Sequence, residues 1–276
     1  GAVPDADDTP SALLALAVLR GAASPSDRAR IDEAARRGLV WLLDLQNRDG
    51  GWPTFCRGWG ALPFDRSGSD LTAHALRALG AWREAAGAWY DAIAPGRIGA
   101  AIARGLAFLA RQQRPDGSWT PLWFGNQHHP DEENPVYGTA RVLLAYRDLG
   151  GLDDASARRG LAWLREHQNA DGGWGGGPAR GTSPASGHVS SVEETAVALE
   201  ALLAAEEGPS PQPIVAKGLE WLVEAVGAGR HREPSPLGLY FARLWYYERL
   251  YPLVFTVAAL NEAVRRFVPA RAPNPL

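Results

Sequence analysis

Three aspartates near the start of the chain are the residues best suited to acid chemistry. Asp5, Asp7 and Asp8 directly precede Thr9 and Pro10, which are typical of a helix start. Crowded carboxylates raise the pKa of at least one member, because two like charges resist ionising together, and burial adds to this effect. The positive end of the helix would then stabilise the conjugate base. The cluster could therefore keep one carboxylic acid protonated and release its proton to a substrate.

A second pair of residues could assist that acid. Asp70 and His74 are four residues apart, so a helix beginning near Ser69 would put both on one face at its N-terminal end. Taken alone, acidic residues before a helix most often only complement its dipole, and a lone histidine is most often a satisfied core residue. The two groups together favour acid chemistry more strongly than either does alone.

An internal repeat determines which helices position these residues. Four copies of the pattern Gly-Leu-x-(Trp/Phe)-Leu begin at Gly38, Gly105, Gly160 and Gly218. The first three copies continue to a glutamine and an Asp-Gly-x-Trp turn, with the pairs Gln46/Trp52, Gln113/Trp119 and Gln168/Trp174. The fourth copy has lost that ending. The segments between the copies have helical spacing and align on Thr9, Thr72, Thr139, Thr195 and Thr256.

Each repeat is therefore predicted to be a helix pair, and the chain to be all-α, because no stretch alternates like a half-buried strand. We expect one domain over residues 1–276, with repeats near 38–82, 105–150, 160–206 and 218–265. Ser191-Val192-Glu193-Glu194 is typical of a capping box, so the glutamates are interpreted as capping residues. Alignment on the threonines predicts that one rim of the inner helices carries Asp7, Asp70, Tyr137 and Glu193.

These motifs resemble those of the squalene cyclase and oxidosqualene cyclase family. The Gln…Asp-Gly-x-Trp endings resemble its QW repeats, and Asp5-Ala6-Asp7-Asp8-Thr9 resembles its DxDD-T motif. Asp70-Leu71-Thr72-Ala73-His74 resembles its D-x-T-A-H segment, and Tyr137-Gly138-Thr139 its Y-G-T segment. The resemblance implies an α/α toroid, here an incomplete ring, in which glutamine and tryptophan tie an outer helix to the start of the next inner one.

The resemblance also implies a role for each acidic residue. Asp7 would be the general acid, Asp5 and Asp8 its carboxylate neighbours, and His74, in the same segment as Asp70, its hydrogen-bond partner. In the family this motif lies well past the middle of a two-domain chain, whereas here it begins at residue 5. We therefore expect a processed product or a part of a longer protein, with an N-terminal part or partner barrel missing.

The carbocation made by such an acid needs a dry cavity with aromatic faces, since water would quench it and rings attract cations. Tyr137 is the best-placed candidate. The other candidates are Trp123, Phe124, Phe64, Tyr240 and Trp245, of which Phe64 resembles the family's substrate-entry constriction. Over residues 240–255, core packing is the more frequent use of such aromatic spacing. The segment 126–134 is longer than its family counterpart, so we expect a reshaped wall near Tyr137.

The activity implied by the resemblance is class II terpene cyclisation, in which a linear isoprenoid such as squalene is protonated and closed to a polycyclic product. No cofactor is implied. One alternative is a class II cyclase of prenyl diphosphates, which would need Mg²⁺ and a basic diphosphate site. Another is a non-catalytic binding module derived from a cyclase. The D-x-T-A-H and Y-G-T segments favour squalene.

Composition argues against several other kinds of protein. The net charge of -3 and the absence of a Lys/Arg cluster argue against nucleic-acid binding. Cys56 is the only cysteine, so no intrachain disulfide can form, which fits the reducing cytoplasm. No apolar run has transmembrane length, and the resemblance implies peripheral membrane contact. The polar segment from His128 to Glu133 is interpreted as a solvated loop, and no metal site is predicted.

Overall fold

A computed structural model gives the arrangement of the helices. The structure describes residues 4–60, 63–86, 88–129, 131–178, 188–234, 236–239 and 244–268. The chain divides into two compact units, one of Gly1–Arg114 with Leu144–Gly151, the other of Pro115–Leu143 with Leu152–Leu276. Each predicted repeat pattern and each aligned threonine lies in a helix of its own, so the prediction of helix pairs is confirmed.

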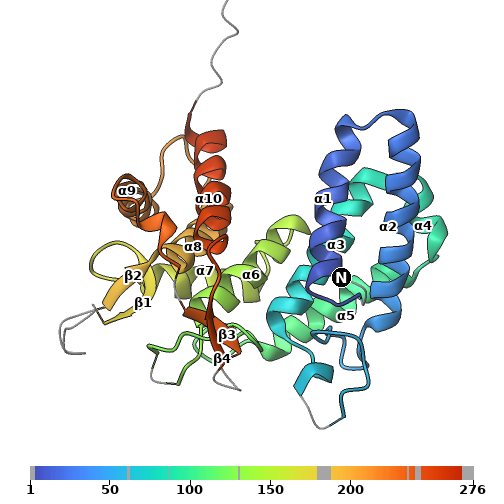
Figure 1. Cartoon of the computed structure of the whole chain (residues 1–276), viewed down its shortest axis with the longest axis horizontal. Coiled ribbons are helices and arrows are strands. Elements are labelled where there is room, and N and C mark those ends of the chain that lie inside the picture. Colours follow the sequence, from blue (N-terminus) through green and yellow to red (C-terminus); the bar gives the residue numbers. More distant parts are fainter. Residues whose placement is uncertain are drawn as a thin grey trace, which may run out of the picture. The chain divides into compact units, whose positions relative to one another are not determined.

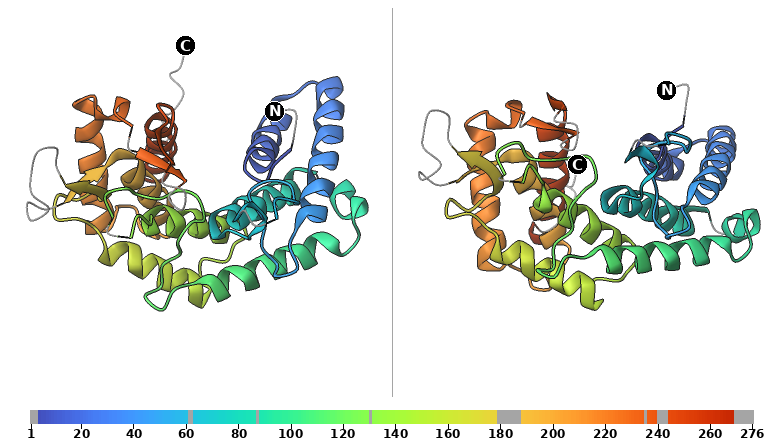
Figure 2. Two further views of the ribbon diagram at one scale, coloured as in Figure 1. Left: turned by 60° about the horizontal axis from the view of Figure 1, so that its bottom comes forward. Right: turned by 90° about the horizontal axis from the view of Figure 1, so that it is seen from below.

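The first unit contains the helices of the earliest repeats (Figures 1 and 2). They are α1 (Asp8–Ala22), α2 (Pro25–Leu45), α3 (Ser69–Ala86), α4 (Ala88–Ile93) and α5 (Arg97–Gln112), with a 3₁₀ turn at Pro63–Asp65. α1 packs against α2 and α3, and α3 packs against α5. α2 follows Ser24, whose hydroxyl accepts a hydrogen bond from Asp27 N–H at 3.2 Å, as an N-cap does.

The second unit contains the later helices and two small sheets. The helices are α6 (Pro135–Asp148), which begins in this unit, α7 (Ala155–Glu166), α8 (Val192–Leu203), α9 (Pro213–Gly227) and α10 (Tyr251–Phe267). The antiparallel pairs are β1 (Trp174–Pro178) with β2 (His188–Ser191) and β3 (Pro236–Leu239) with β4 (Leu244–Tyr247). α10 packs along α8, as Figure 1 shows.

The two sheets correct the prediction of a purely all-α chain. β1 has the sequence Trp-Gly-Gly-Gly-Pro and β3 has Pro-Leu-Gly-Leu, so neither alternates apolar with polar side chains. The pairing of β1 with β2 instead runs from Trp174 opposite Ser191 to Pro178 opposite His188, with an irregularity between. Periodicity could not indicate β1 and β3, because their sequences do not alternate.

The three tryptophan turns, residues 49–52, 116–119 and 171–174, join each repeat to the next inner helix. The backbone N–H of each turn's tryptophan donates to a threonine Oγ1 in that helix, at 3.0 Å for Trp52–Thr72 and 2.9 Å for both Trp119–Thr139 and Trp174–Thr195. The aligned threonines are therefore acceptors for the turn. A hydroxyl at that position gives a buried N–H the partner that it would otherwise lack.

The same tryptophans explain the repeated glycines of the outer helices. A Cβ on Gly160 would lie 2.7 Å from Trp119 Cζ3, and one on Gly218 would lie 2.6 Å from Trp174 Cζ3. Both distances are shorter than carbon atoms tolerate. Each indole therefore packs directly on the backbone of the following outer helix, at a place that only glycine leaves open.

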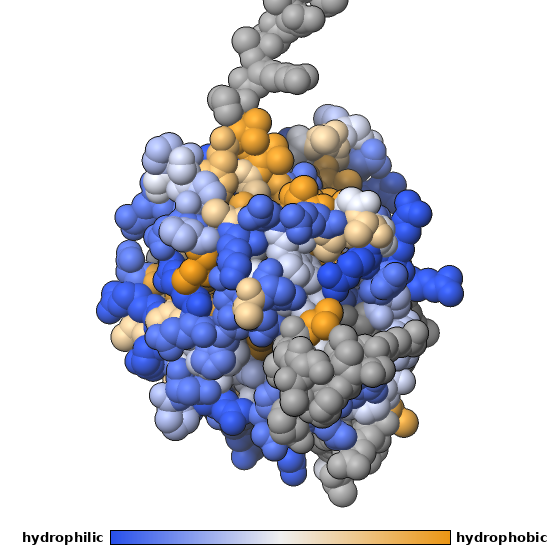
Figure 3. All heavy atoms as spheres, turned by 90° about the vertical axis from the view of Figure 1, so that its left-hand side faces the viewer, coloured by the Kyte–Doolittle hydropathy of each residue, from blue (hydrophilic) through white to orange (hydrophobic). Residues whose placement is uncertain are grey.

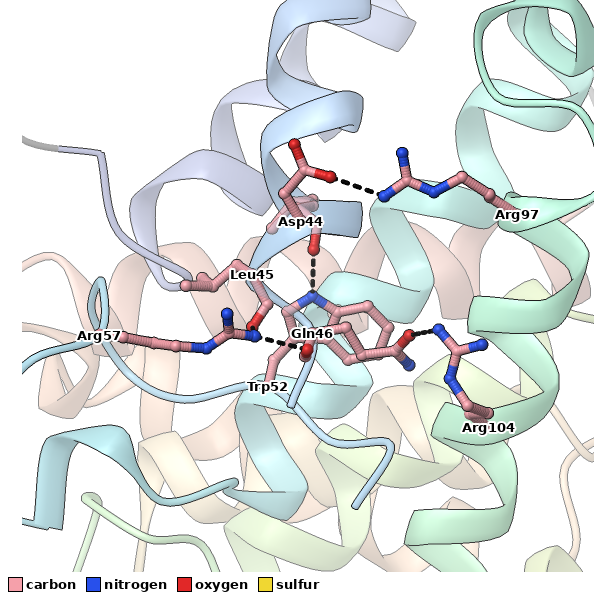
Figure 4. A network of polar contacts seen from close by, with 8 residues as sticks. Asp44, Leu45, Gln46, Trp52, Arg57, Arg97 and Arg104 are labelled. Atoms are coloured by element: carbon pink, nitrogen blue, oxygen red, sulfur yellow. Dashed lines mark hydrogen bonds and ion pairs between the residues drawn. The ribbon is translucent and has the colours of Figure 1, made fainter. Parts of the chain in front are cut away.

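The glutamines reach further than the family resemblance implies. Gln46 Nε2 donates to the carbonyl of Gly50 (2.8 Å), within its own turn, and to that of Ala101 (2.9 Å) in α5. Gln168 makes the equivalent pair of bonds in the second unit, to Gly172 and to Ile214 in α9. Figure 4 shows Arg104 of α5 pointing at the Gln46 side chain, to which it donates. The tryptophan thus holds the next inner helix and the glutamine holds the next outer one.

The last repeat has no tryptophan turn, and its inner helix shows the consequence. On α10, Thr256 is the counterpart of Thr195. Its side chain is only 5% exposed, and its Oγ1 has no hydrogen-bond partner among the described residues.

Apolar side chains also gather at the end of α10, as Figure 3 shows beside the grey trace. The exposed apolar side chains of α10 are Leu253, Val254, Val257 and Val264. In the described part of the chain, no helix is long and apolar enough to cross a membrane.

Candidate active site

The three aspartates of the acidic run have different surroundings. Asp5 Oδ1 accepts hydrogen bonds from the backbone N–H groups of Asp7 (3.0 Å) and Asp8 (2.6 Å), and the Asp5 carbonyl accepts from Thr9 N–H (3.2 Å). Asp5 therefore caps α1, whose first N–H groups have no partner within the helix. The Asp7 side chain makes no capping bond, and both Asp7 and Asp8 are exposed.

One buried residue fixes the run in place. Ala6 is fully buried, and its N–H donates to the carbonyl of Thr54 at 2.9 Å, in the loop after the first tryptophan turn. From the sequence, we expect burial to help raise the pKa of one aspartate in the run. In the structure Ala6 occupies the buried position and Asp7 faces outward, because neighbouring residues at a helix start point about 100° apart.

Ser11 connects the acidic run to His74. Ser11 Oγ donates to the Asp7 carbonyl at 3.2 Å and lies 2.8 Å from His74 Nε2. His74 and the buried Asp70 lie in the first turns of α3, which begins at Ser69 as predicted. Sequence reasoning missed Ser11, although its place four residues after Asp7 puts both on one face of α1. The catalytic roles of Asp5, Asp7, Asp8, Asp70 and His74 stay predictions.

Phe64 lies in a cluster of three aromatic rings next to the acidic run. The ring centroids of Phe55 and Phe64 are 5.2 Å apart, and those of Trp59 and Phe64 are 5.1 Å apart, both edge to face. Thr54 donates its N–H to the Phe64 carbonyl at 3.2 Å, while its own carbonyl holds Ala6. The rings and the acidic run are therefore attached to the same residue. Phe55 and Trp59 were not predicted, because their contacts depend on how the loop closes.

A second aromatic cluster surrounds Tyr137 in the second unit. The ring centroid of Tyr137 is 5.0 Å from that of Phe124 and 6.4 Å from that of Phe255 on α10. Tyr251 stacks on Phe255 with centroids 5.4 Å apart. Tyr137 and Phe124 are buried, and so is Phe255. The structure thus brings together two of the predicted lining residues with two rings of α10.

The other predicted lining residues differ in their exposure. Trp123 is buried, Trp245 lies partly exposed on β4, and Tyr240 lies outside the described residues. The segment 126–134 folds on itself, with Asn126 N–H donating to the Glu132 carbonyl at 3.1 Å. The Asn126 side chain reaches β1, where its Nδ2 donates to the Gly176 carbonyl at 2.8 Å. Lining roles for these residues stay predictions.

A cation lies on the cluster around Tyr137. Arg141 is one turn after Tyr137 on α6, and its guanidinium carbon is 5.2 Å from the Tyr137 ring centroid and 5.5 Å from that of Phe255. Such distances are typical of cation–π contacts. Sequence reasoning missed Arg141, because its i, i+4 spacing from Tyr137 indicates a contact only once Tyr137 is known to be buried.

Glu194 is a buried acid that sequence reasoning assigned only to capping. The capping box is confirmed, since Glu194 N–H donates to Ser191 Oγ at 3.1 Å. The carboxylate also accepts from Gly176 N–H (2.6 Å) and from Asn126 Nδ2 (3.2 Å). Burial raises the pKa of Glu194 to about 7, although these hydrogen bonds act in the opposite direction. A side chain on Gly175 would collide with this carboxyl, so β1 requires glycine at that position.

A cavity of about 320 Å³ adjoins Glu194 in the second unit, lined also by His129, Glu133, Trp163 and His167. His167 stacks on Trp163 with ring centroids 4.0 Å apart. Within the described ranges, no group of three or more His, Cys, Asp or Glu side chains could hold a metal ion. The cavity lies beside α8 and combines a few polar side chains with a lining that is mostly apolar.

Comparison with known proteins places the chain in context. The family described as squalene-hopene cyclase C-terminal domain matches residues 2–265. The squalene–hopene cyclase of Bradyrhizobium diazoefficiens is 30% identical over 272 residues, which cover 91% of this chain and 38% of the relative. Enfumafungin synthase of Hormonema carpetanum is 32% identical over 259 residues, covering 88% of this chain and 18% of the relative. The chain thus spans less than two-fifths of these relatives.

Two solved structures are also similar. The ent-copalyl diphosphate synthase from Streptomyces platensis is 28% identical, with a TM-score of 0.54 over 80% of this chain and 36% of that one. A type II terpene cyclase from Scytonema has a TM-score of 0.54 at 18% identity, over 95% of this chain and 74% of that one. These similarities support the α/α toroid as the fold to which the helix pairs correspond.

Proposed function

Because the chain belongs to the squalene–hopene cyclase C-terminal domain family, we propose that it acts as a class II terpene cyclase. Such an enzyme protonates an alkene of a linear isoprenoid and lets the resulting carbocation close successive rings. Proton transfer from a positioned side chain supplies about 10²–10⁴-fold in rate. The acidic run at the start of α1 is the group of this chain that fits that step.

Asp7 is the proposed general acid. The observation that carries the proposal is the different use of the two aspartates. Asp5 caps α1, whereas the Asp7 side chain makes no capping bond. Ser11 Oγ bonds the Asp7 backbone carbonyl and lies beside His74 Nε2, so it attaches the His74 ring to the backbone of the acidic run. The N-terminus of α1 would stabilise the aspartate left after proton transfer.

Asp7 is exposed in this structure, so the proposed proton transfer requires a cover that keeps water away from it. The longer relatives have the residues for one, since this chain spans 38% of the Bradyrhizobium diazoefficiens cyclase. We propose that an N-terminal part or partner barrel, together with the bound substrate, excludes water from Asp7. We propose that the cyclisation takes place in the cytoplasm, at the surface of a membrane that holds the apolar substrate.

Two substrate classes are candidates. Squalene is favoured by the names of four bacterial relatives, which are squalene–hopene cyclases or probable ones at 28–31% identity. A prenyl diphosphate is favoured by the structure of ent-copalyl diphosphate synthase at 28% identity. Either would be protonated by the same acid, and they differ in whether the isoprenoid carries a charged head group.

The test is product formation by the chain and by its Asp7→Asn variant. Each protein is incubated with squalene and with geranylgeranyl diphosphate, and cyclic products are measured by gas chromatography–mass spectrometry. Asn cannot donate the proton, so we expect a loss of at least about 10²-fold in turnover. Asp27→Asn is the matched control, because Asp27 is likewise an exposed aspartate at the start of a helix, α2.

Two outcomes would contradict the proposal. Unchanged turnover in the Asp7→Asn variant would remove Asp7 as the acid. A folded chain that forms no cyclic product from either substrate, alone or joined to the N-terminal part of a relative, would instead indicate a binding module derived from a cyclase.

A further inference from the structure

The first and third tryptophan turns are built on the same amide contacts. Gln46 and Gln168 each donate to a carbonyl of their own turn and to one in the next outer helix. The asparagine that follows each of them, Asn47 or Asn169, donates from Nδ2 to a backbone carbonyl and to a serine Oγ. Both N–H groups of each of these amides are therefore engaged. Only the amide oxygens are left to bind another group.

In the first turn, an arginine binds to such acceptors. Arg57 Nη2 donates to the carbonyls of Leu45 and Gln46, both at 2.6 Å, as Figure 4 shows. Arg57 Nε donates to Asn47 Oδ1 at 3.3 Å. The carbonyls at a helix end have no partner within the helix and carry its negative partial charge. Because Leu45 is the last residue of α2, a guanidinium is bound at the end of that helix.

The glutamine oxygens of the two turns also differ. Arg104 of α5 donates to Gln46 Oε1. Lys217 has the equivalent place on α9, three residues after the carbonyl that Gln168 holds, but it donates to the Ala170 carbonyl at 2.9 Å. Among the described residues, nothing donates to Gln168 Oε1. The third turn therefore has a glutamine oxygen that can still accept a hydrogen bond.

In the third turn, a cavity adjoins the acceptors that correspond to those of Arg57. His167, Gln168 and Asn169 are the counterparts of the three residues that Arg57 contacts, and all three line the cavity of about 320 Å³ beside α8. In the described part of the chain, no group donates to the carbonyls of His167 and Gln168 or to Asn169 Oδ1. These acceptors lie at the end of α7, where the negative partial charge of the helix favours a cation.

The charges around this cavity also favour a cation. Glu194 and Glu133 belong to its lining, and none of the described lining residues is a lysine or an arginine. Glu194 is 4% exposed, and the groups that donate to its carboxyl are uncharged. A buried negative charge gains stability from a cation at close range, since little water screens the attraction. The stacked rings of Trp163 and His167 add an aromatic wall, which also attracts cations.

We propose that this cavity is a binding site for a guanidinium carried on a short apolar chain, bound at the end of α7 as the guanidinium of Arg57 is bound at the end of α2. The carbonyls of His167 and Gln168 accept its N–H groups, and the Glu194 carboxylate balances its charge. The apolar part of the lining covers the hydrocarbon chain. The site belongs to the second unit, whereas the acidic run belongs to the first, and binding there does not require cyclase activity.

The test compares two ligands that differ in charge. n-Butylguanidinium and n-butylurea have a planar head group and the same chain, but only the guanidinium is charged. Their dissociation constants for the full chain are measured by isothermal titration calorimetry at pH 8, where most of the Glu194 carboxyl is ionised. Glu194→Gln removes the buried charge. Glu220→Gln is the matched control, because Glu220 is exposed on α9, and circular dichroism melting confirms that each variant folds.

We expect the wild-type chain to bind butylguanidinium at least about tenfold more tightly than butylurea, as one charge-assisted hydrogen bond would provide. Glu194→Gln should lose most of that preference without weakening butylurea, and Glu220→Gln should keep all of it. Equal affinities of the wild type for the two ligands would overturn the proposal. A preference that is undiminished in Glu194→Gln would overturn it as well.

A measurement on the wild type alone decides the matter if Glu194→Gln does not fold. A cation in the cavity favours the deprotonated form of Glu194 and of the titratable groups around it, which are Glu193, Glu133, His129 and His167. Butylguanidinium should therefore release protons when it binds at pH 7, so its binding heat should change with the ionisation enthalpy of the buffer. The heat of butylurea should not change. Binding of butylguanidinium without proton release would overturn its placement in this cavity.

Discussion

Glu194→Gln should change how the stability of the protein depends on pH. Burial raises the pKa of Glu194 from its ordinary value of 4.5 to about 7, so between these two pH values the carboxyl is protonated in the folded chain and ionised in the unfolded chain. The folded state then binds more protons. The contribution of Glu194 is therefore fully present below pH 4.5 and is lost as pH rises to about 7.

The size of the effect follows from the shift. A rise from 4.5 to about 7 corresponds to about 3 kcal/mol of unfolding free energy, most of it lost between pH 5 and pH 8. The glutamine of the variant would not titrate. The NH₂ group of the glutamine would also face one of the donors that the carboxylate now accepts from, Gly176 N–H or Asn126 Nδ2. Two donors cannot bond to each other, so this costs about 1 kcal/mol at every pH.

Urea unfolding at pH 5, 6, 7 and 8 measures this effect. Relative to the wild type, the Glu194→Gln variant should gain about 2–3 kcal/mol between pH 5 and pH 8, whatever the constant offset. Glu220→Gln is the matched control, since Glu220 is exposed on α9, and its difference from the wild type should stay flat. A Glu194→Gln difference that does not vary with pH would refute the reasoning that burial governs this carboxyl.

Two further substitutions test the repeat contacts. Gly160→Ala should destabilise the chain by about 1–3 kcal/mol in thermal unfolding, because its Cβ would meet an indole at 2.7 Å. Gly99→Ala, with nothing within 4 Å, should stabilise it by up to about 1 kcal/mol, and similar effects at both sites would contradict the packing argument. Thr256→Val should stabilise the chain by about 1 kcal/mol, because it removes a buried hydroxyl that has no partner among the described residues. Thr195→Val removes the acceptor of the Trp174 N–H and should destabilise the chain by about 1–3 kcal/mol. A gain of stability in both variants would contradict the role given to the threonines.

The helices could be predicted because each repeat encodes them locally. The pattern beginning at Gly105 falls within α5, and the segment aligned on Thr72 falls within α3, since helical periodicity depends on neighbours three and four residues away. The reason for the glycine and the threonine could not be predicted. It lies in Trp52, which contacts Gly105 and Thr72 from another part of the chain.

The candidate site divides in the same way. The order of Asp7, Asp70 and His74 and their places at helix starts could be predicted, because capping and i, i+4 spacing are local. The surroundings of Glu194 and Arg141 could not. Asn126 reaches Glu194 across 68 residues, and Arg141 meets Phe255 only because both lie in the second unit. Such contacts depend on tertiary packing.

The tryptophan turns also imply which helix of the second unit unfolds locally first. A turn shared by two successive repeats couples them as nearest neighbours, so the unit resembles a short one-dimensional array in which local opening begins where a coupling is absent. α8 is held by Trp174, but the hydroxyl of Thr256 on α10 has no such clasp among the described residues. Amide protons of α10 should therefore exchange with solvent before those of α8, and fraying of α10 would loosen the rings of Tyr251 and Phe255 first.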